Sequence, residues 1–143
     1  MDIPKFAVAI LIVLGGLLFY RMEHPLAAIA TDITNQDWDS VVQDNHVAGR
    51  PSLVLFTTSS CGYCRALESK VLSRDDVRAE LKQHYAVYNV DLSSETEEIH
   101  DQATKHGINY VPVLIRYDAF GRETARASYM GPSEMMDFLA AGE

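Results

Sequence analysis

Cysteine, basic residues and long apolar runs are all scarce in this 143-residue sequence. The two cysteines, Cys61 and Cys64, are too few to stabilise a fold by disulfide cross-links, so a disulfide-dense class is excluded. We expect the pair to have a chemical role instead. Only 12 Lys and Arg residues stand against 20 Asp and Glu residues, and the formal net charge of -8 repels phosphate backbones and anionic lipid surfaces. We therefore expect no nucleic acid partner.

The rest of the composition is that of an ordinary globular protein. Hydrophobic residues make up 48% of the chain and charged residues 22%, which excludes collagen-like and disordered classes. The length suits one domain of common size. From Thr31 onward the sequence contains no internal repeat, no low-complexity run and no long linker, so we expect one compact unit over residues 31–143.

An apolar run at residues 6–20 stands apart from that unit. Its 15 residues lie between Lys5 and Arg21 and carry no charge. As a helix they would span about 22 Å, which is less than the ~30 Å hydrocarbon core of a bilayer but fits the upper end of the apolar region of a secretory signal. The weakly positive start of the chain should stay in the cytoplasm, so the residues after about position 25 would be exported.

Three interpretations of residues 1–30 stay open. We favour an uncleaved signal-anchor, in which residues 6–20 tether a periplasmic domain to the inner membrane. The small residues Ala28-Ile29-Ala30 offer a cleavage site, and cleavage near Ala30 would leave a soluble periplasmic protein. Charged residues between the apolar run and that site disfavour cleavage. A buried core helix is the third interpretation.

Hydrophobic periodicity and turn residues predict an α/β fold. After a spacer at His24–Ile33, the expected order is helix, strand, helix, helix, strand, helix, strand, strand, helix. The strands are predicted at Ser52–Thr57, Tyr85–Asp91, Pro112–Tyr117 and Glu123–Tyr129. The helices are predicted from Thr34, over Gly62–Leu72, from Ser73, from Ser94 to a cap at Gly107, and from Pro132. A hairpin turn at residues 118–121 adds an antiparallel edge, so we expect a mixed sheet with helices on both faces.

The two cysteines form a Cys61-Gly62-Tyr63-Cys64 motif between a buried strand and a helix. This places Cys61 at the amino terminus of the helix, where free backbone N–H groups and the helix dipole stabilise an anion. A thiolate in such a motif has a pKa lowered to anywhere from about 3.5 to 7.5 and attacks disulfides at neutral pH. Cys64 lies one turn further along and can displace the mixed disulfide, while Gly62 leaves Cys61 open to a bulky substrate.

Three other interpretations of the cysteine pair are weaker. A zinc site needs two more ligands, and the five histidines have no tight ligand spacing. A purely structural disulfide would close too small a loop to add much stability. An exported chain would have little use for buried free thiols. We therefore expect a redox-active pair, no bound metal and no cofactor.

The strand, the cysteine motif, the helix after it and the Val111-Pro112 step before a late strand together resemble the thioredoxin superfamily. The resemblance covers roughly residues 33–141. Pro112, placed 48 residues beyond Cys64, makes it more specific than a lone Cys-x-x-Cys motif. The implied architecture is the thioredoxin fold, preceded here by an N-terminal hydrophobic helix.

Two branches of the superfamily are similar to different parts of the chain. The Gly-Tyr dipeptide of the motif resembles the site of periplasmic disulfide isomerases. The stretches Val71–Val77, Asn89–Asp91 and Gly107–Pro112 are more similar to the C-terminal thioredoxin-like domain of bacterial transmembrane thiol–disulfide transporters. That second similarity covers more of the chain. The isomerase layout also needs a dimerisation domain, for which residues 21–50 are too few.

The resemblance implies roles for individual residues. Cys61 is implied to be the attacking thiolate and Cys64 the resolving thiol. Pro112 should follow a cis peptide bond in a loop that faces the sulfurs, with the backbone of Val111 pairing with an extended substrate peptide. Further candidates for substrate contact are Gly62, Tyr63 and Gly131.

Two positions depart from the thioredoxin pattern. Ser60 stands where thioredoxins usually have Trp before the first cysteine. Leu55 stands where they bury an acid that helps to take the proton from the resolving thiol. Proton transfer would then use water or another group, such as Glu68 one turn past Cys64, although a solvated surface glutamate is the simpler interpretation of Glu68.

These observations predict an exported thiol–disulfide oxidoreductase that acts on protein disulfides. We expect the reductase direction, through a Cys61 mixed disulfide, with electrons resupplied by a membrane thiol–disulfide donor. The alternatives are a disulfide oxidase or isomerase, whose oxidising direction Val111 before Pro112 favours, and a non-enzymatic redox-sensing or assembly module. The expected partners are protein thiols and disulfides, the membrane donor and, through the N-terminal segment, the membrane itself. The chain is expected to be a monomer.

Overall fold

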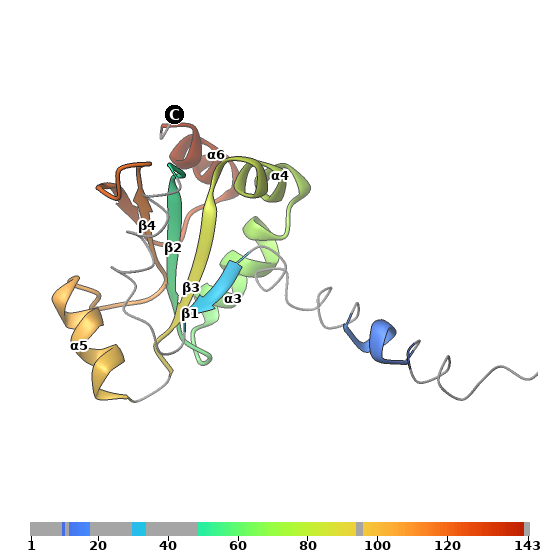
Figure 1. Cartoon of the computed structure of the whole chain (residues 1–143), viewed down its shortest axis with the longest axis horizontal. Coiled ribbons are helices and arrows are strands. Elements are labelled where there is room, and N and C mark those ends of the chain that lie inside the picture. Colours follow the sequence, from blue (N-terminus) through green and yellow to red (C-terminus); the bar gives the residue numbers. More distant parts are fainter. Residues whose placement is uncertain (1–9, 11, 18–29, 34–48, 94–95, 142–143) are drawn as a thin grey trace, which may run out of the picture.

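The computed structural model describes residues 10, 12–17, 30–33, 49–93 and 96–141 (Figure 1). Residues 10 and 12–17 of the apolar run are helical and exposed. Among the described residues, no helix combines the length and the apolar character needed to cross a bilayer. The helix predicted from Thr34, residues Ala28 and Ile29 of the proposed cleavage site and most of the apolar run lie outside the described residues.

A five-stranded mixed sheet forms the centre of the fold (Figure 1). Its strand order is β1-β3-β2-β4-β5. The strands are β1 (Ala30–Ile33), β2 (Ser52–Thr57), β3 (Ala86–Asp91), β4 (Val113–Tyr117) and β5 (Glu123–Ala127). Strands β1 and β2 run parallel to β3, whereas β4 is antiparallel to both β2 and β5. The predicted mixed sheet with an antiparallel hairpin at one edge is thus confirmed.

Strand β1 corrects the predicted spacer at His24–Ile33. Ala30–Ile33 pairs with β3 over four residues, from Ala30 opposite Val87 to Ile33 opposite Val90. A four-residue edge strand whose partner lies more than fifty residues away leaves too weak a local pattern to be recognised in the sequence. The sheet therefore begins at Ala30, the last residue of the predicted signal segment.

Helices cover both faces of the sheet, as predicted (Figure 1). The helical elements are α3 (Gly62–Leu67), the π-helix η2 (Glu68–Leu72), α4 (Asp75–His84), α5 (Glu97–Lys105) and α6 (Pro132–Ala140). Alternate residues of β2 feed two separate cores, because successive side chains of a strand point to opposite faces. Leu53 and Leu55 pack with α3, η2, α4 and α6, and Val54 and Phe56 pack with Ala103 of α5.

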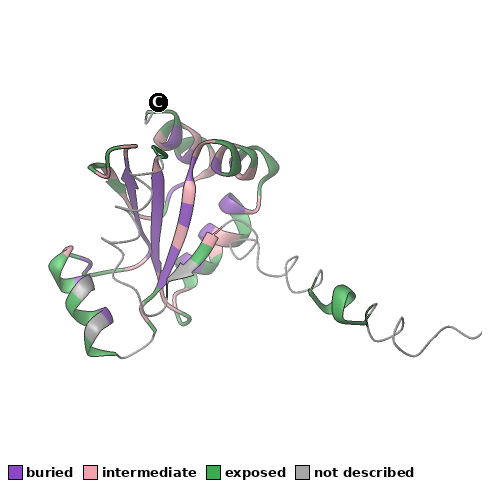
Figure 2. Ribbon diagram, in the orientation of Figure 1, coloured by how far each residue is buried: buried purple, intermediate pink, exposed green. Residues whose placement is uncertain are grey.

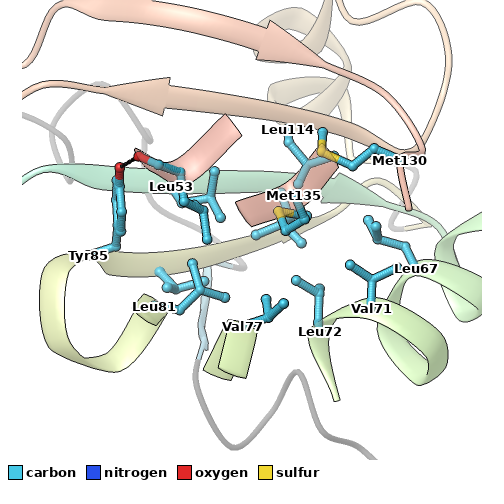
Figure 3. Packing of buried hydrophobic residues seen from close by; sticks show 13 residues of the cluster. Leu53, Leu67, Val71, Leu72, Val77, Leu81, Tyr85, Leu114, Met130 and Met135 are labelled. Carbon is cyan, nitrogen blue, oxygen red and sulfur yellow. Dashed lines mark hydrogen bonds between the residues drawn. The ribbon is translucent and has the colours of Figure 1, made fainter. Parts of the chain in front are cut away.

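The larger core lies beneath the cysteine-bearing helix (Figures 2 and 3). Figure 3 shows Leu67 and Val71 beside Leu72, facing Met135 and Leu114 across the core. All five side chains are fully buried. At about 25 cal/mol for each Å² of apolar surface removed from water, such residues contribute roughly 2 kcal/mol each, which holds the helix against the sheet.

The helix predicted over Gly62–Leu72 changes its winding at Glu68. There α3 gives way to η2, and this wider turn places the consecutive residues Val71 and Leu72 in the core together. Ser73, predicted as the start of the next helix, instead ends η2, and its hydroxyl donates to the carbonyl of Ser69 at 2.6 Å. Helix α4 begins after Arg74. Wide turns of this kind often mark functional sites.

Two predicted turns are confirmed. Gly107 has φ +67 just after α5, and Gly121 has φ +72 in the hairpin turn, a left-handed conformation that glycine adopts at little cost. Strand β5 is shorter than predicted and stops at Ala127, and the hydroxyl of the next residue, Ser128, donates to the carbonyl of Pro112. Strand β4 begins after Pro112, which has no N–H to donate to the ladder.

Candidate active site

The two cysteines lie where β2 leads into α3. After β2 ends at Thr57, the backbone N–H of Cys61 donates to the carbonyl of Thr58 at 3.2 Å and closes a tight turn. Cys61 is the N-cap of α3, with an extended backbone, and Cys64 lies in the first turn of the helix. The two form a disulfide with a Cα–Cα separation of 5.2 Å. The structure thus confirms the predicted strand–motif–helix placement.

The two sulfurs have different environments. Cys61 is half-buried, whereas the Cys64 residue is only 6% exposed and belongs to the core side of α3. The backbone N–H of Cys64 donates to Sγ of Cys61 at 3.0 Å. When the pair is reduced, the same N–H can donate to a Cys61 thiolate, and a hydrogen bond to the charged form favours ionisation. This asymmetry makes Cys61 the accessible sulfur.

The turn between the cysteines is open to solvent. Gly62 is exposed, and a Cβ added there would meet no atom closer than Nη2 of Arg65 at 4.0 Å. The Tyr63 residue is 69% exposed, and its ring contacts that of Tyr129 with centroids 5.7 Å apart and planes tilted by 57°. Tyr129 precedes α6 and was not singled out in the sequence, because a contact across 66 positions has no local signal.

A hydrogen-bonded network fastens the segment before Cys61, and sequence reasoning missed it. The backbone N–H of Ser59 donates to Oγ of Ser93 at 2.6 Å, and the Ser93 hydroxyl lies 3.0 Å from that of Ser59. The backbone N–H of Ser93 in turn donates to Asp91 at the end of β3. From the other side, Nη1 of Arg65 donates to the Ser59 carbonyl at 3.0 Å. Arg65 of α3, Asp91 of β3 and Ser93 just beyond β3 therefore hold this turn.

The Val111–Pro112 peptide bond is cis, as expected. Pro112 is buried and Val111 half-buried. Because Val113 pairs with Phe56 of β2, Pro112 lies at the same end of the sheet as Thr57, where the chain leaves for the cysteines. The substrate-contacting role of Val111 and Pro112 stays a prediction.

Gly131 forms the N-cap of α6, and its backbone N–H donates to Oε2 of Glu134 at 2.8 Å. The residue before it, Met130, is buried in the core next to Leu67 and Leu114 (Figure 3). A Cβ at Gly131 would lie 3.6 Å from Glu134, which is an ordinary contact. A plain cap therefore explains this glycine, and its role in substrate binding stays a prediction.

The position of the missing acid is fully apolar. Leu55 is 1% exposed in the core under α3. Two residues further along the same face, the hydroxyl of Thr57 donates to Oδ1 of the buried Asn89 at 2.9 Å, a polar contact that the sequence did not reveal. Glu68, the other candidate helper, is half-buried in the first position of η2.

The clear pKa shifts lie away from the cysteines. The backbone N–H of Arg122 lowers the pKa of Asp118 in the β4–β5 turn, and the Arg74 guanidinium lowers that of Asp76 at the start of α4. The described residues include no group of three or more His, Cys, Asp or Glu side chains placed to hold a metal ion.

A five-stranded mixed sheet with a Cys-x-x-Cys disulfide at a strand-to-helix turn defines the class of thioredoxin-fold proteins. The thioredoxin-like domain model matches residues 39–143, so the chain belongs to the thioredoxin-like domain family. A search of the curated proteins found no match. With its disulfide pair, this fold supports the general class of thiol–disulfide oxidoreductases.

Solved structures share the fold at low sequence identity. The oxidoreductase DsbH is 18% identical, with a TM-score of 0.60 over 80% of this chain and 87% of DsbH. The reduced C-terminal domain of DsbD from Neisseria meningitidis is 9% identical, with a TM-score of 0.68 over 79% of this chain and 100% of that domain. A thioredoxin from Thermus thermophilus is 20% identical, with a TM-score of 0.62 over 79% and 86%.

Proposed function

We propose that this protein is a thioredoxin-like reductase of protein disulfides outside the cytoplasm. The observation that carries the proposal is the asymmetry of the cysteine pair. Cys61 is half-buried at the start of α3 and accepts a backbone N–H, whereas Cys64 is shielded one turn below. An accessible, anion-stabilised sulfur paired with a shielded one suits attack on a bulky substrate followed by internal resolution.

The reaction begins from the dithiol form. The Cys61 thiolate attacks one sulfur of the substrate disulfide, and the other substrate sulfur leaves as a thiolate that takes up a proton. Cys64 then loses its proton and attacks Cys61, which releases the second substrate sulfur. Two electrons pass to the substrate, whose disulfide becomes two thiols, and the enzyme is left with the Cys61–Cys64 disulfide. A membrane dithiol donor returns the two electrons.

The proton of Cys64 needs an acceptor other than an acid at Leu55, because that side chain is an apolar core residue. We propose that water reaching the half-buried Cys61 takes this role. The Thr57–Asn89 contact offers only a hydroxyl and an amide, neither of which ionises near neutral pH.

The proposed setting is the periplasm, with residues 6–20 as the anchor in the inner membrane. The uncharged apolar run supports this, and so does the shared fold of the DsbD C-terminal domain and DsbH. Residues 21–29 would then link the anchor to the sheet at Ala30. Mass spectrometry of the protein from its host tests the anchor, because cleavage near Ala30 would yield a shortened chain.

Turnover and reduction potential together test the proposed function. We expect the reduced protein to reduce insulin disulfides catalytically, with a potential toward the reducing end of the roughly -270 to -120 mV range of Cys-x-x-Cys proteins when equilibrated against glutathione. A potential near -120 mV would make it an oxidase. No catalytic turnover in either direction would favour a redox-sensing or assembly module.

A further inference from the structure

Two tyrosine rings beside the disulfide are exposed although they touch each other. The Tyr63 residue is 69% exposed and Tyr129 is 41% exposed, with ring centroids 5.7 Å apart. A tilted contact at this distance is a favourable geometry for an aromatic pair. Because Tyr63 lies between the cysteines in sequence, the pair sits at the border of the reacting sulfurs. The exposed faces of the two rings are apolar surface that is not buried within the fold.

The residues on either side of Tyr129 fix the position of its backbone. On one side, the hydroxyl of Ser128 donates to the carbonyl of Pro112 at 3.0 Å. On the other, Met130 is buried in the core beside Leu67 and Leu114 (Figure 3). Three consecutive residues therefore join the loop of the cis proline, the turn of the cysteines and the core. A ring presented from such a fixed backbone loses little conformational freedom when it binds a ligand.

The chemistry of this surface selects among substrates. Two phenol rings present neutral, apolar faces, and such faces gain most by covering an aliphatic or aromatic side chain. The chain has a net charge of -8, and Glu134 lies in the first turn of α6, five residues beyond Tyr129. This net charge disfavours strongly acidic substrates as a whole.

We propose that Tyr129, together with Tyr63, determines substrate specificity by binding an apolar side chain next to the substrate cysteine. This inference rests on the proposed function, and it names as preferred substrates those protein disulfides whose cysteines have aliphatic or aromatic neighbours. Tyr129 binds the flanking residue and takes no part in the exchange of the sulfurs.

Model peptides test this specificity. The full chain, reduced beforehand, is mixed with one of two homodimeric peptide disulfides that differ only in having Leu or Ser before the cysteine. We expect a rate ratio of about tenfold in favour of Leu, which corresponds to about 1.4 kcal/mol. Tyr129→Ser should bring the ratio close to one, and Tyr129→Phe should keep it, because the ring rather than the hydroxyl makes the contact. Phe120→Ser, which removes an aromatic residue that is 64% exposed in the β4–β5 turn, should change neither rate.

The outcomes separate this inference from the proposed function. Wild-type protein that fails to reduce even hydroxyethyl disulfide, which has no flanking residues, overturns the proposed function and the inference with it. Wild-type protein that reduces this compound but treats both peptides alike overturns only the specificity. Equal slowing of both peptides by a folded Tyr129→Ser variant, checked by circular dichroism, likewise overturns it and assigns Tyr129 a structural role.

Discussion

The guanidinium of Arg65 donates a hydrogen bond of 3.0 Å to the carbonyl of Ser59, two residues before the first cysteine. The same side chain approaches Gly62, on the other side of Cys61, to 4.0 Å from where a Cβ would stand. One cation therefore spans the turn that carries the accessible sulfur. It braces the turn and places positive charge near the thiolate of the reduced enzyme.

Replacing Arg65 should make Cys61 less reactive at low pH. In Arg65→Gln the Cys61 thiolate loses a nearby cation that stabilises its negative charge. We expect alkylation of Cys61 by iodoacetamide at pH 6 to slow by roughly two- to fivefold, a modest effect because solvent screens the exposed guanidinium. Arg65→Lys, which keeps the charge, should retain most of the rate.

Lys82→Gln is the matched control for this change. It removes the same charge from α4, near the start of β3 and so at the sheet end opposite the cysteines. Its alkylation profile should coincide with that of wild type. Equal slowing in both glutamine variants would assign the effect to net charge rather than to the position of Arg65.

Replacing Cys61 and replacing Cys64 should stop the reaction at different steps. Cys61→Ser lacks the attacking sulfur, so insulin reduction should fall to the uncatalysed rate. Cys64→Ser can still attack but cannot resolve, so it should accumulate mixed disulfides with substrate, visible by non-reducing electrophoresis. Trapping by Cys61→Ser and none by Cys64→Ser would reverse the two roles.

The phenol of Tyr85 should contribute measurably to stability. It is buried, and its hydroxyl donates to the carbonyl of Leu139 at 2.7 Å, which ties the start of β3 to the end of α6 (Figure 3). Tyr85→Phe leaves that carbonyl without this donor and should lower the free energy of unfolding by about 1–2 kcal/mol in urea denaturation. Tyr110→Phe, at a residue that is 57% exposed, should stay within about 0.5 kcal/mol of wild type. Equal losses in both variants would contradict this assignment.

The β4–β5 turn should weaken in acid. The backbone N–H of Arg122 donates to Asp118 at 3.0 Å and is the largest cause of the lowered pKa of that carboxyl. A carboxyl whose pKa is lower in the folded state stabilises the fold above its ordinary pKa, and this contribution is lost as the pH falls through the lowered value. The amide resonances of Phe120 and Arg122 should therefore titrate in that range. Asp118→Asn should remove this titration, and an unchanged step in that variant would point to another group.

Local sequence patterns were sufficient to predict an element or a turn wherever the contacts that decide its structure lie close together in sequence. The turn at Asp118–Gly121 is closed by Asp118's own carboxylate and by a glycine with positive φ, and both are readable from four residues. The continuous apolar run of β2 predicts a strand buried on both faces. Ser73 misled the prediction because a serine hydroxyl can serve either the helix before it or the one after it, and the core decides between them through Val71 and Leu72.

The sequence by itself determined the Cys61–Cys64 motif at a strand-to-helix turn and the glycines that close its turns, because helix starts and tight turns depend on neighbouring residues. Only the tertiary structure decided the pairing of β1 with β3, the bracing of Ser59 by Ser93 and the contact of Tyr63 with Tyr129. Each of these joins residues more than thirty positions apart. Such contacts form only when the two cores bring their segments together, so no local pattern encodes them.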